Sequence, residues 1–215
     1  MSRLNDLGFA PSSTHSLKRS DTWDAVLMDE ADLLQRWAGV SVDLEHSHDG
    51  TGASPRKVYI DKRQLDFLFG HFEPTKYRTA LFFALAHEFG HAVQFKVLGE
   101  AETLARLRVE VEAHADILSG VWLGIRLFQD QPYTYEDVRD AAFQLKDHIP
   151  DYPTTRQRIE LVQTGMEDAY MLRVLEQFMK HHHNYRELSD GLPLYDFKGT
   201  YEKAQEILAK GGAPR

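Results

Sequence analysis

The chain has 215 residues, with 25 basic and 33 acidic side chains, a formal net charge of −8 at pH 7, and no cysteine. The acidic balance argues against nucleic acid as a partner, because no basic excess exists to neutralise phosphates, and the lack of cysteine excludes disulfides and thiolate metal ligands. No run of eighteen apolar residues and no signal-like apolar core occurs, so we expect a cytoplasmic protein without a membrane span. A polar lead-in at residues 1–19 precedes one expected globular domain, residues 20–215.

The first expected elements are a helix and two strands. The helix begins near Ser20, which can cap it, and ends before Gly39. Residues 40–45 and 57–61 each alternate apolar and polar side chains, which is the period of a half-buried strand. A stretch rich in turn residues, 46–55, separates them. We therefore expect the two strands to pair as a hairpin across an exposed loop.

A strongly apolar helix is expected at residues 79–95, and it carries the order H-E-x-x-H. His87 and His91 are four residues apart, so their imidazoles lie on one helix face and can bind a single metal ion. Glu88 adjoins that face, where its carboxylate can deprotonate a metal-bound water. The apolar surroundings predict burial, and buried polar groups need partners, which a zinc ion would supply. A chance match to the motif has a risk of roughly a few per cent, so a third ligand is the test.

A second long helix is expected at residues 102–128, and it carries Glu110, Glu112, His114 and Asp116. Glu112 and Asp116 are four residues apart and share a face. Glu112 can therefore bind the metal while Asp116 accepts a hydrogen bond from a ligating histidine. Glu110 or His114 is the alternative ligand, and a solvated face is the commoner place for glutamates. The apolar neighbours of Asp116 favour its burial.

The rest of the chain is expected to be mostly helical. Two capping boxes, Thr134–Asp137 and Thr154–Gln157, begin helices on either side of an irregular segment with two prolines at residues 148–153. Gly165 is expected to interrupt or kink the second of these helices. A last amphipathic helix is expected at residues 200–210.

These motifs carry a family resemblance. The string H-E-F-G-H-A-V-Q from His87, followed by E-A-H-A-D-I-L-S-G-V-W from Glu112, resembles the bacterial neutral zinc metallopeptidases. Those proteins are zincins whose third zinc ligand is a glutamate in an E-x-x-x-D helix. Residues 151–158, D-Y-P-T-T-R-Q-R, are similar to a segment that follows the zinc site in that family. Tyr152 stands where the relatives carry histidine, and the resemblance spans residues 58–165.

The expected fold is α+β, mainly α, and zincin-like, with a small sheet or hairpin packed on the H-E-x-x-H helix. In zincins an edge strand lies beside the zinc helix and pairs with extended substrate backbone. Residues 57–61 hold that place in the order of the chain. This strand is therefore expected either to pair with substrate or to be purely structural.

The function that the motifs favour is hydrolysis of peptide bonds in a peptide or protein substrate. A zinc ion with three protein ligands and one open position lowers the pKa of bound water to about 7. Glu88 would take the proton as the water attacks and pass it to the leaving nitrogen. The developing oxyanion needs a further hydrogen-bond donor. The candidate donors come from one stretch of chain: Tyr152, His148, Arg156 and Arg158.

Alternatives remain open at two levels. Tyr152 either donates to the oxyanion or packs its ring on the adjoining helices while His148 or an arginine is the donor. The whole protein is either an enzyme or a zinc-dependent regulatory or sensing protein that binds a partner with little turnover. A purely structural role for the helices is a further class, and Glu88 argues against it because a structural zinc site needs no general base.

Overall fold

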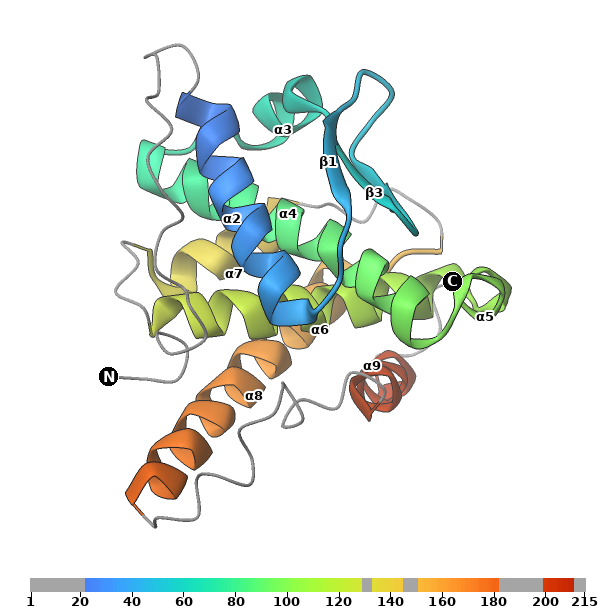
Figure 1. Cartoon of the computed structure of the whole chain (residues 1–215), viewed down its shortest axis with the longest axis vertical. Helices are drawn as coiled ribbons and strands as arrows, with labels where there is room; N and C mark the ends of the chain where they lie inside the picture. Colours follow the sequence, from blue (N-terminus) through green and yellow to red (C-terminus); the bar gives the residue numbers. More distant parts are fainter. Residues whose placement is uncertain (1–21, 129–132, 145–150, 182–198, 211–215) are drawn as a thin grey trace.

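A computed structural model describes residues 22–128, 133–144, 151–181 and 199–210 (Figure 1). The fold is mainly α with a small mixed sheet, as the sequence predicts. The lead-in predicted at residues 1–19 lies outside the described residues. The elements in chain order are α2 (Thr22–Ala38), β1 (Asp43–His46), β2 (Gly52–Ser54), β3 (Lys57–Ile60), α3 (Lys62–Phe69), α4 (Pro74–Val97), α5 (Glu100–Ala105), α6 (Arg108–Leu127), α7 (Tyr135–Gln144), α8 (Thr155–His181) and α9 (Gly199–Lys210).

Helix α4 lies at the centre of these elements. In Figure 1 the strands and α3 lie above α4 and α6, and α8 and α9 lie below them. Helices α2, α6 and α7 contact α4, and so do strands β2 and β3, so the predicted packing of the sheet on this helix is confirmed. The residues from Thr79 to His87 are buried without interruption, as expected for a helix that is apolar nearly all round.

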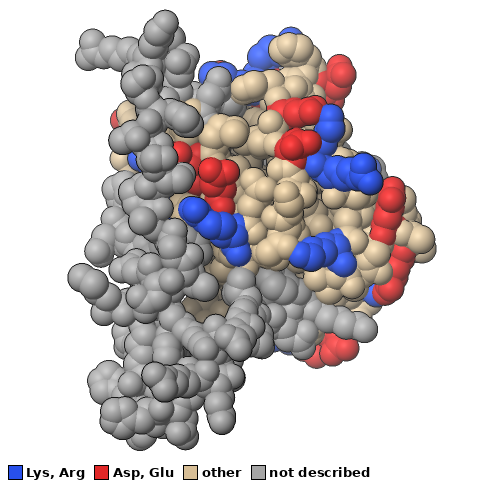
Figure 2. All heavy atoms as spheres, in the orientation of Figure 1, with Lys and Arg blue, Asp and Glu red and all other residues tan. Residues whose placement is uncertain are grey.

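Two further features of the structure are the charge distribution on its surface and the composition of its helices. On the face shown in Figure 2, basic and acidic side chains lie interspersed among uncharged ones, so the net acidic charge is not gathered into one field on that face. Within the described residues, no helix combines the length and the apolar composition needed to cross a membrane.

The sheet differs from the predicted hairpin. Its strand order is β1-β3-β2, with β1 parallel to β3 and β2 antiparallel to it. The stretch predicted to be an exposed loop therefore contains a strand, Gly52–Ser54, whose small residues give no sequence signal for one. Because β3 is the central strand, both of its edges are already paired. Of the two alternatives for residues 57–61, the one in which this strand offers an edge to substrate is therefore wrong.

The single helix predicted at residues 102–128 is in fact two helices, α5 and α6. The chain is extended at Arg106 and Leu107, with ψ of 159° and 134°. At this break the guanidinium of Arg106 lies 4.0 Å from the ring centroid of Tyr201 on α9. The break makes Arg108 the first residue of α6, so Glu112 lies about one turn into that helix.

Helices α6 and α8 cross with their backbones in contact. A Cβ added at Gly120 would lie 2.1 Å from the carbonyl oxygen of Val162, and one added at Gly165 would lie 2.1 Å from that of Ile117. Helix α8 continues through Gly165, so of the predicted interruption or kink the interruption is wrong, and the glycine allows the close approach to α6. The crossing brings the first turn of α8 against α6.

The local signals in the second half of the chain are confirmed. In the first capping box, the Thr134 hydroxyl accepts a hydrogen bond from Asp137 N, and the Asp137 carboxylate accepts one from Thr134 N. Thr154 and Gln157 make the same reciprocal pair at the start of α8. The predicted helix at residues 200–210 is α9.

Candidate metal centre

Three side chains from two helices converge on one point. His87 and His91 on α4 and Glu112 on α6 offer ligand atoms that all lie within 4.8 Å of one another. Glu112 Oε2 lies 3.1 Å from His87 Nε2 and 3.7 Å from His91 Nε2. Two ligands bound to zinc at about 2.1 Å in a tetrahedron lie about 3.4 Å apart. The observed distances lie on either side of that value, so these three side chains can hold one metal ion.

Helix packing explains why the ligands meet. The two histidines are four residues apart on α4, and their rings lie edge to face with centroids 4.9 Å apart. Between them, Gly90 faces α6, where an added Cβ would lie 3.0 Å from Ala115 Cα. A larger residue at this position would push the helices apart. The close approach thus brings Glu112 within reach of both imidazoles.

The three ligands also interact as charges when no metal is bound. Burial by itself lowers the pKa of His87, but the carboxylates of Asp116 and Glu112 outweigh it and raise the pKa to about 10. Burial likewise raises the pKa of Glu112, but His87 and His91 hold it well below its usual range. A protonated histidine then takes the place of the cation. Metal binding must displace that proton, so it should release protons to solvent.

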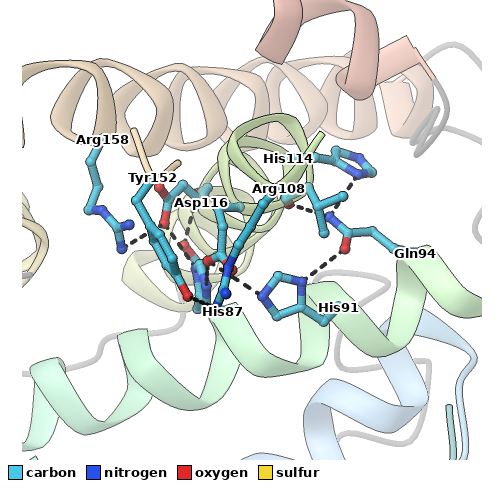
Figure 3. A network of polar contacts seen from close by, with 11 residues as sticks. His87, His91, Gln94, Arg108, His114, Asp116, Tyr152 and Arg158 are labelled. Atoms are coloured by element: carbon cyan, nitrogen blue, oxygen red, sulfur yellow. Dashed lines mark hydrogen bonds and ion pairs between the residues drawn. The ribbon is translucent and has the colours of Figure 1, made fainter. Parts of the chain in front are cut away.

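Asp116 lies behind His87 and is fully buried, with 0% of its surface exposed. Its Oδ1 is 2.9 Å from His87 Nδ1 and 3.4 Å from Arg158 Nη1. The first distance is that of a hydrogen bond, but its angle is not, and both carboxylate oxygens are without a hydrogen-bond partner among the described residues. Arg158 is itself only 4% exposed. Asp116 therefore lies between His87 and a buried cation, Arg158 (Figure 3), while its predicted hydrogen bond with a ligating histidine stays a prediction.

Glu88 lies next to the candidate ligands but is not one of them. Its side chain is partly buried, and none of the described residues forms a hydrogen bond or ion pair with its carboxylate. Burial raises its pKa above the ordinary value, and the charges of His91 and His87 oppose that shift. The Glu88 carboxylate thus lies beside the two histidines and is available to accept a proton.

Tyr152 reaches the same site from the segment that precedes α8. Figure 3 shows its ring beside Arg108 and pointing toward His87. The Arg108 guanidinium covers the ring at 4.6 Å and donates a hydrogen bond to the tyrosine hydroxyl, and its Nε lies 3.8 Å from Glu112 Oε1. Burial raises the pKa of Tyr152, and the charge of Glu112 adds to the rise. The phenol keeps its own proton and can still donate it.

Of the other predicted candidates, those that the structure describes do not gather at the ligands. Glu110 accepts hydrogen bonds from Tyr201 and Gln205 of α9 and so faces away from the two histidines. His114 is buried on that same side of α6, next to Tyr201. Arg156 is exposed to solvent, and His148 lies outside the described residues.

Sequence reasoning missed two residues that touch the ligands. Arg108 is four residues before Glu112, a spacing visible in the sequence, but the predicted helix start at residue 102 gave it no special place. Gln94 is three residues after His91 and accepts a hydrogen bond from its Nδ1 at 2.9 Å. That spacing on one helix is a signal that could have revealed it.

No protein family, curated protein or solved structure matches the chain. The likeness to neutral zinc metallopeptidases therefore rests on the motifs themselves and on the convergence of His87, His91 and Glu112.

Proposed function

We propose that the protein is a zinc-dependent metallopeptidase that hydrolyses peptide bonds, with Glu88 as the general base. One observation carries the proposal. Two histidines of an H-E-x-x-H helix and a glutamate from a second helix converge as a possible metal site, and the glutamate between the histidines remains outside the set. A purely structural site has no use for that carboxylate, whereas a hydrolase requires one.

The donor set favours zinc. Two imidazole nitrogens and one carboxylate oxygen are a common ligand set for zinc in hydrolases, and it leaves one coordination position open. Zinc bound in this way acidifies water to a pKa of about 7 and polarises a carbonyl group. His87, His91 and Glu112 would hold the ion, and Asp116 would orient the His87 ring from behind.

The chain's own side chains then carry the proton. The Glu88 carboxylate accepts a proton from water as the water oxygen bonds to the peptide carbonyl carbon. It returns that proton to the amide nitrogen as the C–N bond breaks, so the products are a carboxylate and an amine. Partial exposure of Glu88 allows water to reach it, and partial burial favours a raised pKa, which suits a group that must both take and give a proton.

We also propose that Tyr152 donates a hydrogen bond to the oxyanion formed during attack. Two observations support this role. Tyr152 lies beside Glu112, and Arg108 donates to the tyrosine oxygen, which leaves the phenolic proton available. Arg108 holds the ring in place and adds positive charge at the same edge of the site. Arg158, by contrast, is buried against Asp116 and acts through that residue.

We further propose that residues 20–215 act as one catalytic domain. The buried side chains of α2, α4, α6, α7, α8 and α9 belong to one hydrophobic cluster, which supports this division.

The test uses the full chain, with zinc content and proteolysis of denatured protein substrates measured together. The wild type should bind zinc and cleave, and a chelator should abolish cleavage. Glu88→Gln is nearly isosteric but cannot accept the proton, so it should keep the zinc and the fold while turnover falls by about 10²–10⁴-fold. A wild type that binds zinc and cleaves no peptide would instead favour a regulatory or sensing protein.

A further inference from the structure

A line of hydrogen bonds leads from the ligand His91 away from the metal site to the last helix. His91 Nδ1 lies 2.9 Å from Gln94 Oε1, and Gln94 Nε2 lies 3.3 Å from His114 Nδ1. His114 Nε2 in turn lies 2.7 Å from the hydroxyl oxygen of Thr200, in the first turn of α9. Gln94, His114 and Thr200 are all buried. Figure 3 shows the part of this line from His91 to His114.

One backbone carbonyl fixes the direction of every bond in the line. Gln94 Nε2 lies 2.6 Å from the carbonyl oxygen of Val111, which can only accept, so the amide nitrogen and not the amide oxygen must face it. Gln94 Oε1 therefore faces His91, and the proton between them must belong to His91 Nδ1. The second amide hydrogen of Gln94 points to His114 Nδ1, which must accept it. The His114 proton is then on Nε2, donated to Thr200.

The consequence reaches the metal ligand. When His91 carries its proton on Nδ1, the lone pair of its neutral ring is on Nε2, the nitrogen that faces Glu112. A hydrogen bond at the far nitrogen of a ligating histidine fixes both its tautomer and its orientation. Gln94 supplies that bond, and His114 and Thr200 hold Gln94 in the one orientation that can supply it.

The far end of the line is where α9 docks on α6. The Tyr201 hydroxyl donates a hydrogen bond to Glu110 at 2.9 Å, and its ring lies edge to face with that of His114 at 5.3 Å. Arg106 covers the other part of the Tyr201 ring. Thr200 and Tyr201 are thus adjacent residues of α9 that form hydrogen bonds with the same face of α6. The bond of Thr200 goes to His114, which belongs to the line that ends at His91, whereas the bond of Tyr201 goes to Glu110, which does not.

We propose that Gln94, His114 and Thr200 are positioning residues that hold His91 as a metal ligand and make zinc affinity depend on the docking of α9. The proposal rests on the metal site of the proposed function and not on hydrolysis. A protein that binds zinc but cleaves nothing would refute the peptidase while leaving this relay to be judged by affinity.

The adjacent residues of α9 provide a matched pair of variants. Thr200→Val removes the hydroxyl that accepts a hydrogen bond from His114 Nε2–H, and Tyr201→Phe removes the hydroxyl bonded to Glu110. Zinc affinity of the full chain, measured by competition with a chromophoric chelator, should weaken by roughly threefold or more in Thr200→Val, below the 10–100-fold seen for direct partners of a ligand. Tyr201→Phe should stay within about twofold of wild type. Equal affinities in the two variants, whether weakened or unchanged, would overturn the proposal.

A spectroscopic measurement tests the same bonds without relying on variants. Long-range ¹H–¹⁵N correlation spectra distinguish the two neutral tautomers of histidine. In the zinc-loaded wild type, His114 should be the neutral Nε2–H tautomer and His91 should carry its proton on Nδ1. A His114 ring protonated on Nδ1 would break the line at Gln94 and refute the proposal.

Discussion

Arg158 offers the sharpest test of how the site is held together. Its guanidinium lies 3.4 Å from Asp116, and both side chains are almost completely withdrawn from water. Replacing Arg158 by Met keeps much of the length and apolar volume but removes one of the two cations beside the Asp116 carboxylate. The other, His87, is shared with Glu112. Removing one partner of a buried ion pair costs about 3–5 kcal/mol. For a chain of this length, that is a fall in Tm of about 6–20 °C.

Arg156→Met is the matched control, because Arg156 is two residues away on the same helix turn and exposed to solvent. Its effect on the free energy of unfolding should stay within about 0.5 kcal/mol. Thermal and urea denaturation of the full chain measure both variants. The double variant Arg158→Met with Asp116→Asn should lose less than the sum of the single losses, because the two residues interact directly. Additive losses, or a loss below about 1 kcal/mol for Arg158→Met, would refute the reasoning.

Three further predictions follow from the metal centre. Glu112→Gln should empty the zinc site of protein purified without added metal, whereas Glu110→Gln should keep the zinc; elemental analysis measures both, and the reverse result would make Glu110 the ligand. Tyr152→Phe should lower kcat about 10-fold or more at unchanged zinc content and Tm, and unchanged turnover would leave the ring as packing alone. In the metal-free protein the pKa of His87 is raised to about 10. Its ion pair therefore stabilises the folded state fully below the ordinary histidine pKa of about 6.5, and this stabilisation is lost as the pH rises from 6.5 toward 10. Denaturation in chelator should show a loss of about 2.3 kcal/mol from pH 6.5 to 8.5, and a flat profile would contradict the ion pair.

The parts of the fold that local signals determine were predictable. Helix α4 follows from an apolar run behind a proline at its first position. The helices that begin after Thr134 and Thr154 follow from capping boxes, Thr134–Asp137 and Thr154–Gln157. Such signals depend on neighbours within one or two turns. The sequence therefore predicts the starts of α7 and α8 closely, whereas α4 begins at Pro74, before the predicted residues 79–95.

The errors fall where distant residues decide. The parallel pairing of β1 with β3 depends on a third strand that has no β-branched or aromatic residue. The break before Arg108 lies beside a contact between Arg106 and Tyr201, residues separated by the whole of α6, α7 and α8. Gly165 was read as a helix breaker because its partner helix was not known. No pattern within a short window contains this information.

The polar residues of α6 show how far spacing can go in assigning a site. Glu110, Glu112, His114 and Asp116 alternate along the chain, and on a helix each step of two residues turns about 200°. Spacing thus separates two pairs, Glu112 with Asp116 and Glu110 with His114, but does not say which pair faces the histidines. Packing decides it, because α4 lies on one side of α6 and α9 on the other. The metal site and the docking surface for α9 are therefore opposite faces of one buried helix. Among the described residues, Gln94 of α4 contacts both sides: its amide oxygen faces His91 at the metal site, and its amide nitrogen faces His114 on the side that α9 covers. In the proposed relay, a change at the surface that α9 covers reaches the candidate metal site through that amide.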